Sequence, residues 1–173
     1  MDDKGRRFTA TIGIDPGKNG GISYVYGTEP VSFAWKMPES DREVFCLLSD
    51  ISKGVVCGAV IEAVWSSPQM GVASAFTFGR GVGALHMALA ALRIPFLEVR
   101  PQVWQKDLGC LTGGDKNITK ALATQLFPTV RVPRVRHALA TQLFPTVKVT
   151  HSVADALLIA EWGRRHHGIS RRK

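Results

Sequence analysis

The sequence lacks the features of membrane and secreted proteins. No apolar run approaches the roughly 20 residues that a membrane-spanning helix needs, and the charged start MDDKGRR is not followed by the apolar segment of a signal peptide. Acidic residues are also few, because 14 Asp+Glu stand against 22 Lys+Arg and give a formal net charge of +8. We therefore expect no membrane partner and favour a polyanionic partner such as nucleic acid.

Cysteine is scarce as well. The chain has three cysteines, Cys46, Cys57 and Cys110, an odd number at wide separations without the spacing of zinc ligands. Cys46 and Cys57 lie in apolar surroundings, so we predict that both are buried thiols. This cysteine usage fits a reducing cytoplasm.

The composition predicts one globular domain. A length of 173 residues with 45% apolar and 21% charged residues suits a single domain with its own core. We expect residues 1–7 and 168–173 to be flexible, basic tails. The fold is then carried by the residues between them.

Alternating and apolar segments predict an α/β fold. Three strands come first and form an antiparallel meander, and two later strands alternate with helices, which gives a mixed five-stranded sheet with helices on both faces. Ser40 or Asp41 is expected to cap the first helix. The predicted strands are 9–15, 22–27, 31–37, 55–63 and 94–101, and the predicted helices are 41–52, 69–92 and a short helix from Pro101.

The segment ALATQLFPTV occurs twice, at 121–130 and 138–147. Two copies are too few for a solenoid, which needs about three stacked repeats. Each copy predicts a short helix that ends at proline and is followed by a basic, β-prone segment. Only one copy can occupy the native helix position, so we interpret the other as a local insertion, which costs little loop entropy. An additional hairpin or pairing with another chain remains open.

Four residues far apart in the sequence suggest a metal site. Asp15 and Glu62 each close an apolar strand, and His151 and Asp155 share one face of a predicted helix. Oxygen-rich sets with one imidazole suit hard divalent cations such as Mg²⁺ or Mn²⁺. With the excess positive charge, this set indicates metal-dependent cleavage of phosphodiesters.

Each of these residues also has a simpler explanation. Asp15 could cap a turn, and Glu62 could be a partly exposed strand end. His151 could be a solvated residue that precedes an N-cap at Ser152, and His137, at the end of the first copy's basic segment, competes with it as a ligand.

Four segments, taken in order, resemble the RuvC-type Holliday junction resolvases of the RNase H-like superfamily, in particular the phage and organellar branch. They are GIDPGKNGG, IEAVWSSPQMGVASAFTFGRGVG, RPQVWQKDLG and HSVADALLIAEWG, and they span roughly residues 9–163. The family's first, second and last acids fall on Asp15, Glu62 and Asp155, whereas His151 stands where many members have a third acid. The resemblance implies an RNase H-like fold in a bacterial or phage-infected cell.

The resemblance also implies a reaction. Two Mg²⁺ or Mn²⁺ ions would flank the scissile phosphate of a four-way DNA junction, with Asp15 between them, Glu62 on one and His151 with Asp155 on the other. Symmetric nicks would leave 5′-phosphate and 3′-hydroxyl ends. Family members act as two-fold homodimers, and the Ala- and Gly-rich helix 69–92 is the expected interface.

Substrate contacts are expected from other residues. Trp65 resembles the aromatic residue that family members stack at the junction, although it could simply be a core residue. Lys106 and Lys116 resemble the family's basic residues near the phosphates, and each could instead be an ordinary surface charge. The remaining candidates for contact with the DNA backbone are Arg80, Arg100 and Lys120.

Three other functions compete on the sequence alone. GIDPGKNGG also resembles the phosphate loop of sugar kinases and actin, but those proteins need two lobes and a second phosphate-binding turn, which 173 residues do not supply. A non-catalytic junction-binding protein would explain the substituted His151. Another RNase H-like nuclease could act on a different branched or hybrid substrate.

Overall fold

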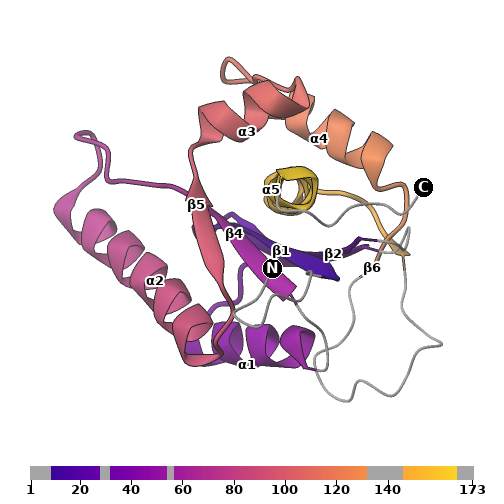
Figure 1. Ribbon diagram of the computed structural model, residues 1–173. Helices are drawn as coiled ribbons and strands as arrows, with labels where there is room; N and C mark the ends of the chain where they lie inside the picture. Colours follow the sequence, from indigo (N-terminus) through magenta and orange to yellow (C-terminus); the bar gives the residue numbers. More distant parts are fainter. Residues whose placement is uncertain (1–8, 28–31, 54–56, 132–145, 167–173) are drawn as a thin grey trace.

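A mixed sheet forms the centre of the protein (Figure 1). The computed structural model describes residues 9–27, 32–53, 57–131 and 146–166. Five strands run in the order β3-β2-β1-β4-β5, antiparallel among β1, β2 and β3 and parallel among β1, β4 and β5, which confirms the predicted sheet. They are β1 (Ala10–Asp15), β2 (Gly21–Tyr26), β3 (Ser32–Lys36), β4 (Cys57–Glu62) and β5 (Phe96–Val99).

Helices cover both faces of the sheet, as predicted (Figure 1). Helices α1 (Asp41–Ser52) and α2 (Val72–Ala91) lie on one face. Helices α3 (Pro101–Leu108), α4 (Lys116–Leu126) and α5 (His151–His166) lie on the other. Among the helices of the described ranges, none is both long and apolar enough to cross a membrane.

Local sequence explains where the helices begin and end. Ser40 caps α1 in a reciprocal capping box with Glu43, so of the two predicted caps Ser40 is the one used. Pro101 occupies the first turn of α3, and Gly109 ends that helix in the left-handed region at φ 71°. Helix α2 begins at Val72, later than predicted, and has no side-chain cap.

Two short strands extend the sheet beyond β3, at the start of the β-prone segment predicted after each repeat copy. Their pairing with the sheet goes beyond the five predicted strands. Strand β6 (Val130–Arg131) is parallel to β3, and β7 (Thr146–Val147) is antiparallel to β6. Val130 and Val147 hold the same position in the two copies of ALATQLFPTV, and they face each other across this pair. The two ends of the segment between them therefore lie side by side.

The first copy of the repeat supplies the second half of α4. Its Ala123 and Phe127 are buried in the core under α5. The helix of the second copy (138–144) and His137 lie outside the described residues. So do the tails 1–7 and 168–173 and the tip of the turn between β2 and β3 at 28–31.

One prediction about the cysteines was wrong. Cys57 is buried in β4, but Cys46 is exposed on α1. The buried residues of α1 are Val44, Leu47 and Leu48, whose spacing places them on one face of the helix and leaves residue 46 on the opposite side.

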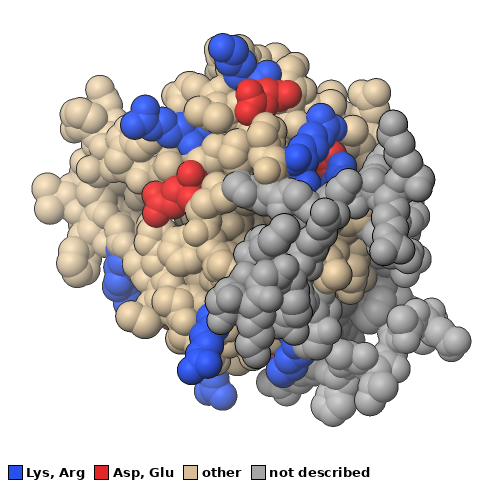
Figure 2. Space-filling model, in the orientation of Figure 1, with Lys and Arg blue, Asp and Glu red and all other residues tan. Residues whose placement is uncertain are grey.

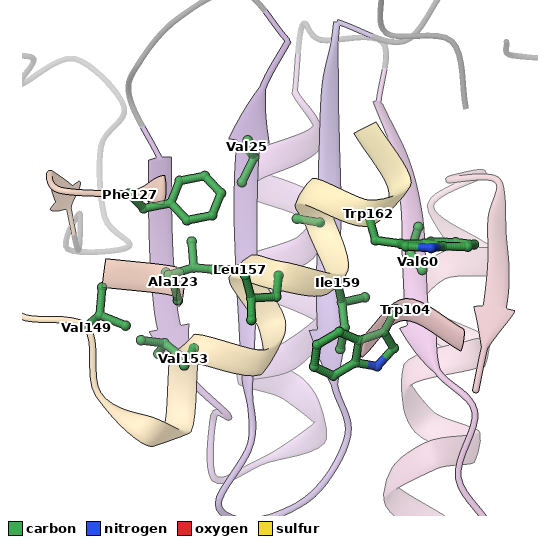
Figure 3. Packing of buried hydrophobic residues seen from close by; sticks show 14 of the residues in the cluster. Val25, Val60, Trp104, Ala123, Phe127, Val149, Val153, Leu157, Ile159 and Trp162 are labelled. Carbon is green, nitrogen blue, oxygen red and sulfur yellow. The ribbon is translucent and has the colours of Figure 1, made fainter. Parts of the chain in front are cut away.

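Helix α5 packs directly on the backbone of the sheet. A Cβ atom at Gly13 would lie 2.1 Å from the carbonyl oxygen of Ala156, and one at Gly163 would lie 2.4 Å from Val60 Cγ2. The Ser23 hydroxyl donates a hydrogen bond of 2.8 Å to the same Ala156 oxygen. Figure 3 shows the apolar side of this contact, where α5 contributes Val153, Leu157, Ile159 and Trp162.

We expect Gly13→Ala to destabilise the fold strongly. The new methyl group would collide with backbone atoms of α5, and overpacking of this kind costs about 1–3 kcal/mol or more. Urea unfolding should show the free energy of unfolding reduced by about 3 kcal/mol. Gly79→Ala is the control, because in the described part of the chain nothing beyond the neighbouring backbone of its own helix lies within 4 Å of the added Cβ, and alanine favours helix by up to about 1 kcal/mol. Equal effects of both changes would contradict this account.

We expect removal of residues 131–147 to leave the fold intact. The deletion joins Val130 to Lys148, the residue after Val130's partner in the β6–β7 pair. Val130 and Val147 are antiparallel partners, which lie about 4.5–5.5 Å apart, and Lys148 is the next residue, so the join replaces the β6–β7 pair by a tight turn. Lys148 follows the second copy just as Arg131 follows the first, so the join restores one copy with a basic residue after it. The melting temperature should stay within about 5 °C of the full chain. A drop of more than about 10 °C would show that the inserted segment is structurally required.

Candidate active site

Three carboxylates come together at one end of the sheet. Asp15 is the last residue of β1 and Glu62 the last residue of β4. These strands are parallel neighbours, so their ends meet at the edge where α/β sheets bind ligands. Asp155 lies one turn inside α5, the helix that packs on β1 through Gly13. The role of these three acids as a catalytic and metal-binding set stays a prediction.

The environment of the three acids disfavours negative charge. Burial, followed by the nearby charges of Glu62 and Asp155, raises the pKa of Asp15 from 3.8 to about 7. Burial likewise raises the pKa of Glu62 and of Asp155, and the charge of Asp155 adds to the rise at Glu62. Acids with this kind of perturbation are typical of functional sites.

Two basic side chains oppose this rise. Lys116, the first residue of α4, lowers the pKa of all three acids and therefore lies within electrostatic reach of each. His151 lowers the pKa of Asp155 alone, and its Nε2 lies 3.3 Å from Asn117 Oδ1. Helix α5 begins at His151, so the alternative that Ser152 caps it is wrong. His151 thus lies beside the acids, and its role as a ligand stays a prediction.

Neutral donors contact two of the three half-buried carboxylates, Glu62 and Asp155. The indole Nε1 of Trp104 donates to Glu62 Oε1 at 3.0 Å. Burial raises the pKa of Asp155, and a hydrogen bond from the Thr119 hydroxyl acts against the rise. Asp155 Oδ1 is buried and has no hydrogen-bond partner in the described part of the chain.

The donor set fits a hard divalent cation. In the described ranges, no three His, Cys, Asp or Glu side chains are already gathered closely enough to hold a metal ion. Like-charged carboxylates repel one another, and a cation would draw them inward. The unpartnered Asp155 Oδ1 and the raised pKa values of all three acids are what a carboxylate site for Mg²⁺ or Mn²⁺ would show without its ion.

Of the predicted DNA contacts, two lie on α4 near the acids and the other four lie in other parts of the chain. Lys116 lies at the acids, and Lys120 follows it one turn later on α4. Arg80 is elsewhere, 3.9 Å from Asp41 of α1, with both side chains exposed. Trp65 is 62% exposed, so the alternative that it is a core residue is wrong. Arg100 and Lys106, at the start and near the end of α3, are exposed.

The basic side chains do not form one continuous patch on the face shown in Figure 2. Lys and Arg lie in several separate groups around that face, two of them next to acidic residues. The excess positive charge therefore contributes a general attraction for polyanions there.

Trp104 is the residue near the site that the sequence did not single out. It lies in the RPQVWQKDLG segment and is fully buried. One signal was present, since a tryptophan in a short polar helix directly after a strand must bury its ring and find a partner for its N–H. The sequence does not show which residue accepts this hydrogen bond. Glu62 is the acceptor because β5, which leads into α3, pairs with β4.

Comparison with solved structures identifies the architecture. The chain is similar to Thermus thermophilus RuvC in complex with a Holliday junction substrate, with a TM-score of 0.56, 15% identity, and coverage of 91% of this chain and 95% of that one. A second Thermus thermophilus RuvC structure gives a TM-score of 0.54 at 15% identity, over 90% and 95% of the two chains. The chain has an RNase H-like fold.

The fold is shared beyond bacteria. The yeast mitochondrial Holliday junction resolvase Ydc2 gives a TM-score of 0.51 at 14% identity, over 96% of this chain and 82% of that one. No protein-family model matches the sequence, and no curated protein matches it significantly. At these identities the likeness establishes the fold alone, and the function has to be argued from the site.

We expect Asp15→Asn to stabilise the protein at high pH. Because the pKa of Asp15 is raised, the folded state keeps a proton that the unfolded state loses, so the destabilisation is absent below about pH 4 and grows until about pH 7. The asparagine removes it, which is worth on the order of 2–4 kcal/mol.

Urea unfolding of both proteins without divalent cations at pH 4, 6 and 8 measures this difference. The variant should be more stable at pH 8 and similar at pH 4. Asp50→Asn, which neutralises an acid on α1 that is 41% exposed, should show no such trend. A constant difference across this pH range would contradict the raised pKa.

Proposed function

We propose that this protein is a metal-dependent endonuclease that resolves four-way DNA junctions. The observation that carries the proposal is the cluster of Asp15, Glu62 and Asp155, three acids with raised pKa values. Two of them end strands and the third lies on α5 of an RNase H-like fold, and Lys116 lies beside them. Such a cluster is costly to the apo protein, which is understandable if its purpose is to hold cations. Similarity to a RuvC bound to a Holliday junction suggests the substrate class.

Asp15, Glu62, Asp155 and His151 would together hold two Mg²⁺ or Mn²⁺ ions. When bound, such ions supply activation of a water molecule and stabilisation of the leaving oxygen. The chain itself fixes the positions of these ligands on two strand ends and one helix. Hydrolysis would leave 5′-phosphate and 3′-hydroxyl ends.

Lys116 is suited to bring the phosphate to the acids. Its ammonium group acts on all three carboxylates, so it lies where an anionic oxygen would arrive. A cation there reduces the repulsion between the acids and a phosphodiester. Lys120, on the next turn of α4, would extend this positive charge along the DNA backbone.

Trp65 is suited to contact an opened junction. It follows Glu62 by three residues, is 62% exposed, and lies between β4 and α2. An exposed indole gains about 1–3 kcal/mol when a base stacks on it. Its closeness in sequence to a site acid would keep the stacked base near the scissile phosphate.

Helix α2 is suited to form a two-fold interface. Its buried residues are Leu85, Ala88 and Leu89, all near its C-terminal end, and its Val72 and Phe76 are 88% and 74% exposed. An exposed apolar helix face of this kind marks an interaction surface. A two-fold dimer would place two sites so that opposite strands of a symmetric junction are cut.

We expect the wild type to nick a labelled four-way junction in Mg²⁺ or Mn²⁺, with paired nicks on opposite strands. Asp15→Asn should lower the rate by roughly 10³-fold or more, because it removes a ligand worth several kcal/mol to the transition state. Denaturing gels of end-labelled junction strands measure the nicks, and a gel shift in Ca²⁺ measures binding. Asp50→Asn is the matched control and should cut normally.

The possible outcomes separate the alternatives. If wild type and Asp15→Asn bind the junction equally and neither cuts, the protein is a non-catalytic junction-binding protein and the proposal is wrong. If flaps or RNA–DNA hybrids are cut faster than four-way junctions, the metal-dependent chemistry stands and the substrate class is wrong.

A further inference from the structure

Trp104 is buried against a carboxylate of the site. It is the buried residue of α3, with no exposed surface, and its indole Nε1 donates to Glu62 Oε1 at 3.0 Å. A buried indole N–H needs an acceptor. Here the acceptor is a side chain of the acid cluster, so the bond fixes the position of Glu62 as well as satisfying Trp104.

Helix α3 is a rigid support for this donor. Pro101 fixes its first turn and Gly109 ends it in the left-handed region. Asp107 on the same helix accepts a hydrogen bond of 2.8 Å from the indole Nε1 of Trp162 on α5. Figure 3 shows Trp104 of α3 and Trp162 of α5 in the same core. The position of the Trp104 ring is therefore set by contacts that do not involve Glu62.

The sheet register brings the two residues together. Val99 of β5 lies opposite Glu62 of β4, and the Ala63 amide donates to the Val99 carbonyl oxygen at 2.7 Å. Helix α3 begins two residues after Val99, so its first turns lie next to the end of β4. The hydrogen bonds of the described residues include one to Glu62 Oε1 and none to its second oxygen. The bond thus holds one oxygen and leaves the other for a cation.

We infer that Trp104 is a positioning residue, whose indole N–H holds the Glu62 carboxylate in the orientation that binds a divalent cation. This inference rests on the proposed function, because it assigns Glu62 to the metal. Hydrogen-bond partners behind metal ligands typically change metal affinity by about 10–100-fold when they are lost. Trp104 touches a ligand rather than the substrate and so acts through Glu62.

The test compares two substitutions that each remove one indole N–H. Trp104→Phe keeps an aromatic ring in the core and removes the bond to Glu62. Trp162→Phe removes the equivalent bond to Asp107, away from the acids, and is the matched control. Mn²⁺ binding is measured by the electron paramagnetic resonance signal of free Mn²⁺, and nicking is measured as a function of Mn²⁺ concentration.

We expect Trp104→Phe to need about 10-fold more Mn²⁺ or more, both for binding and for half-maximal nicking, and to approach the wild-type rate at saturating Mn²⁺. Trp162→Phe should keep the wild-type Mn²⁺ dependence even if its melting temperature falls. Equal Mn²⁺ dependence of Trp104→Phe and wild type would overturn the inference while the nuclease proposal stands. A wild type that binds Mn²⁺ but does not cut would overturn the nuclease proposal, and the binding data alone would then decide the role of Trp104.

A measurement on the unmodified protein covers the case in which Trp104→Phe does not fold. Paramagnetic Mn²⁺ should broaden the indole N–H resonance of Trp104 before that of Trp162, because Glu62 would hold the ion next to Trp104. Broadening of Trp162 first, or of neither resonance at concentrations that saturate nicking, would overturn the inference.

Discussion

The backbone contact between α5 and the centre of the sheet is the constraint on which the site depends. Residues on β1 alternate, so that Ile12 and Ile14 enter the core under α1 and α2 while Gly13 faces α5. The absent side chain lets the Ala156 carbonyl approach β1, and the Ser23 hydroxyl of β2 donates a hydrogen bond to it. Asp155 is the preceding residue. The packing of one helix turn on one glycine therefore sets where the third acid stands relative to Asp15.

Placing the three acids close together and partly buried costs electrostatic free energy. Burying Asp15, Glu62 and Asp155 together raises all three pKa values, and Lys116 offsets only part of the rise. The arrangement persists because packing of the surrounding core fixes the backbone positions of the acids, as in other sites that hold unfavourable arrangements. A divalent cation would relieve the repulsion and add stability through linkage. The free energy of unfolding should then rise with the concentration of the bound cation.

Much of this was predictable, and the failures have physical causes. The strands and the acids at their ends follow from short-range patterns, since alternation and a carboxylate after an apolar run are visible locally. The apolar neighbours of Cys46 do not bury it, because the helical spacing of Val44, Leu47 and Leu48 places residue 46 on the opposite side of α1. The Trp104–Glu62 bond depends on the pairing of β5 with β4, and β6 and β7 exist only through pairing. Contacts between distant segments leave no periodic signal in either one.

The repeat shows how a long-range constraint can decide between identical sequences. Both copies of ALATQLFPTV could form the same half-helix, so the choice falls to the residues before them. Lys116 and Thr119 precede the first copy, and Pro133 and Arg136 stand at the same distances before the second. Thr119 is 2% exposed and hydrogen-bonds Asp155, so an arginine in its place would bury a charge against the core. Proline in place of Lys116 would remove the cation that moderates the acids. Packing and the acid cluster therefore both favour the first copy in α4, because that helix carries Thr119 and Lys116 next to the acids.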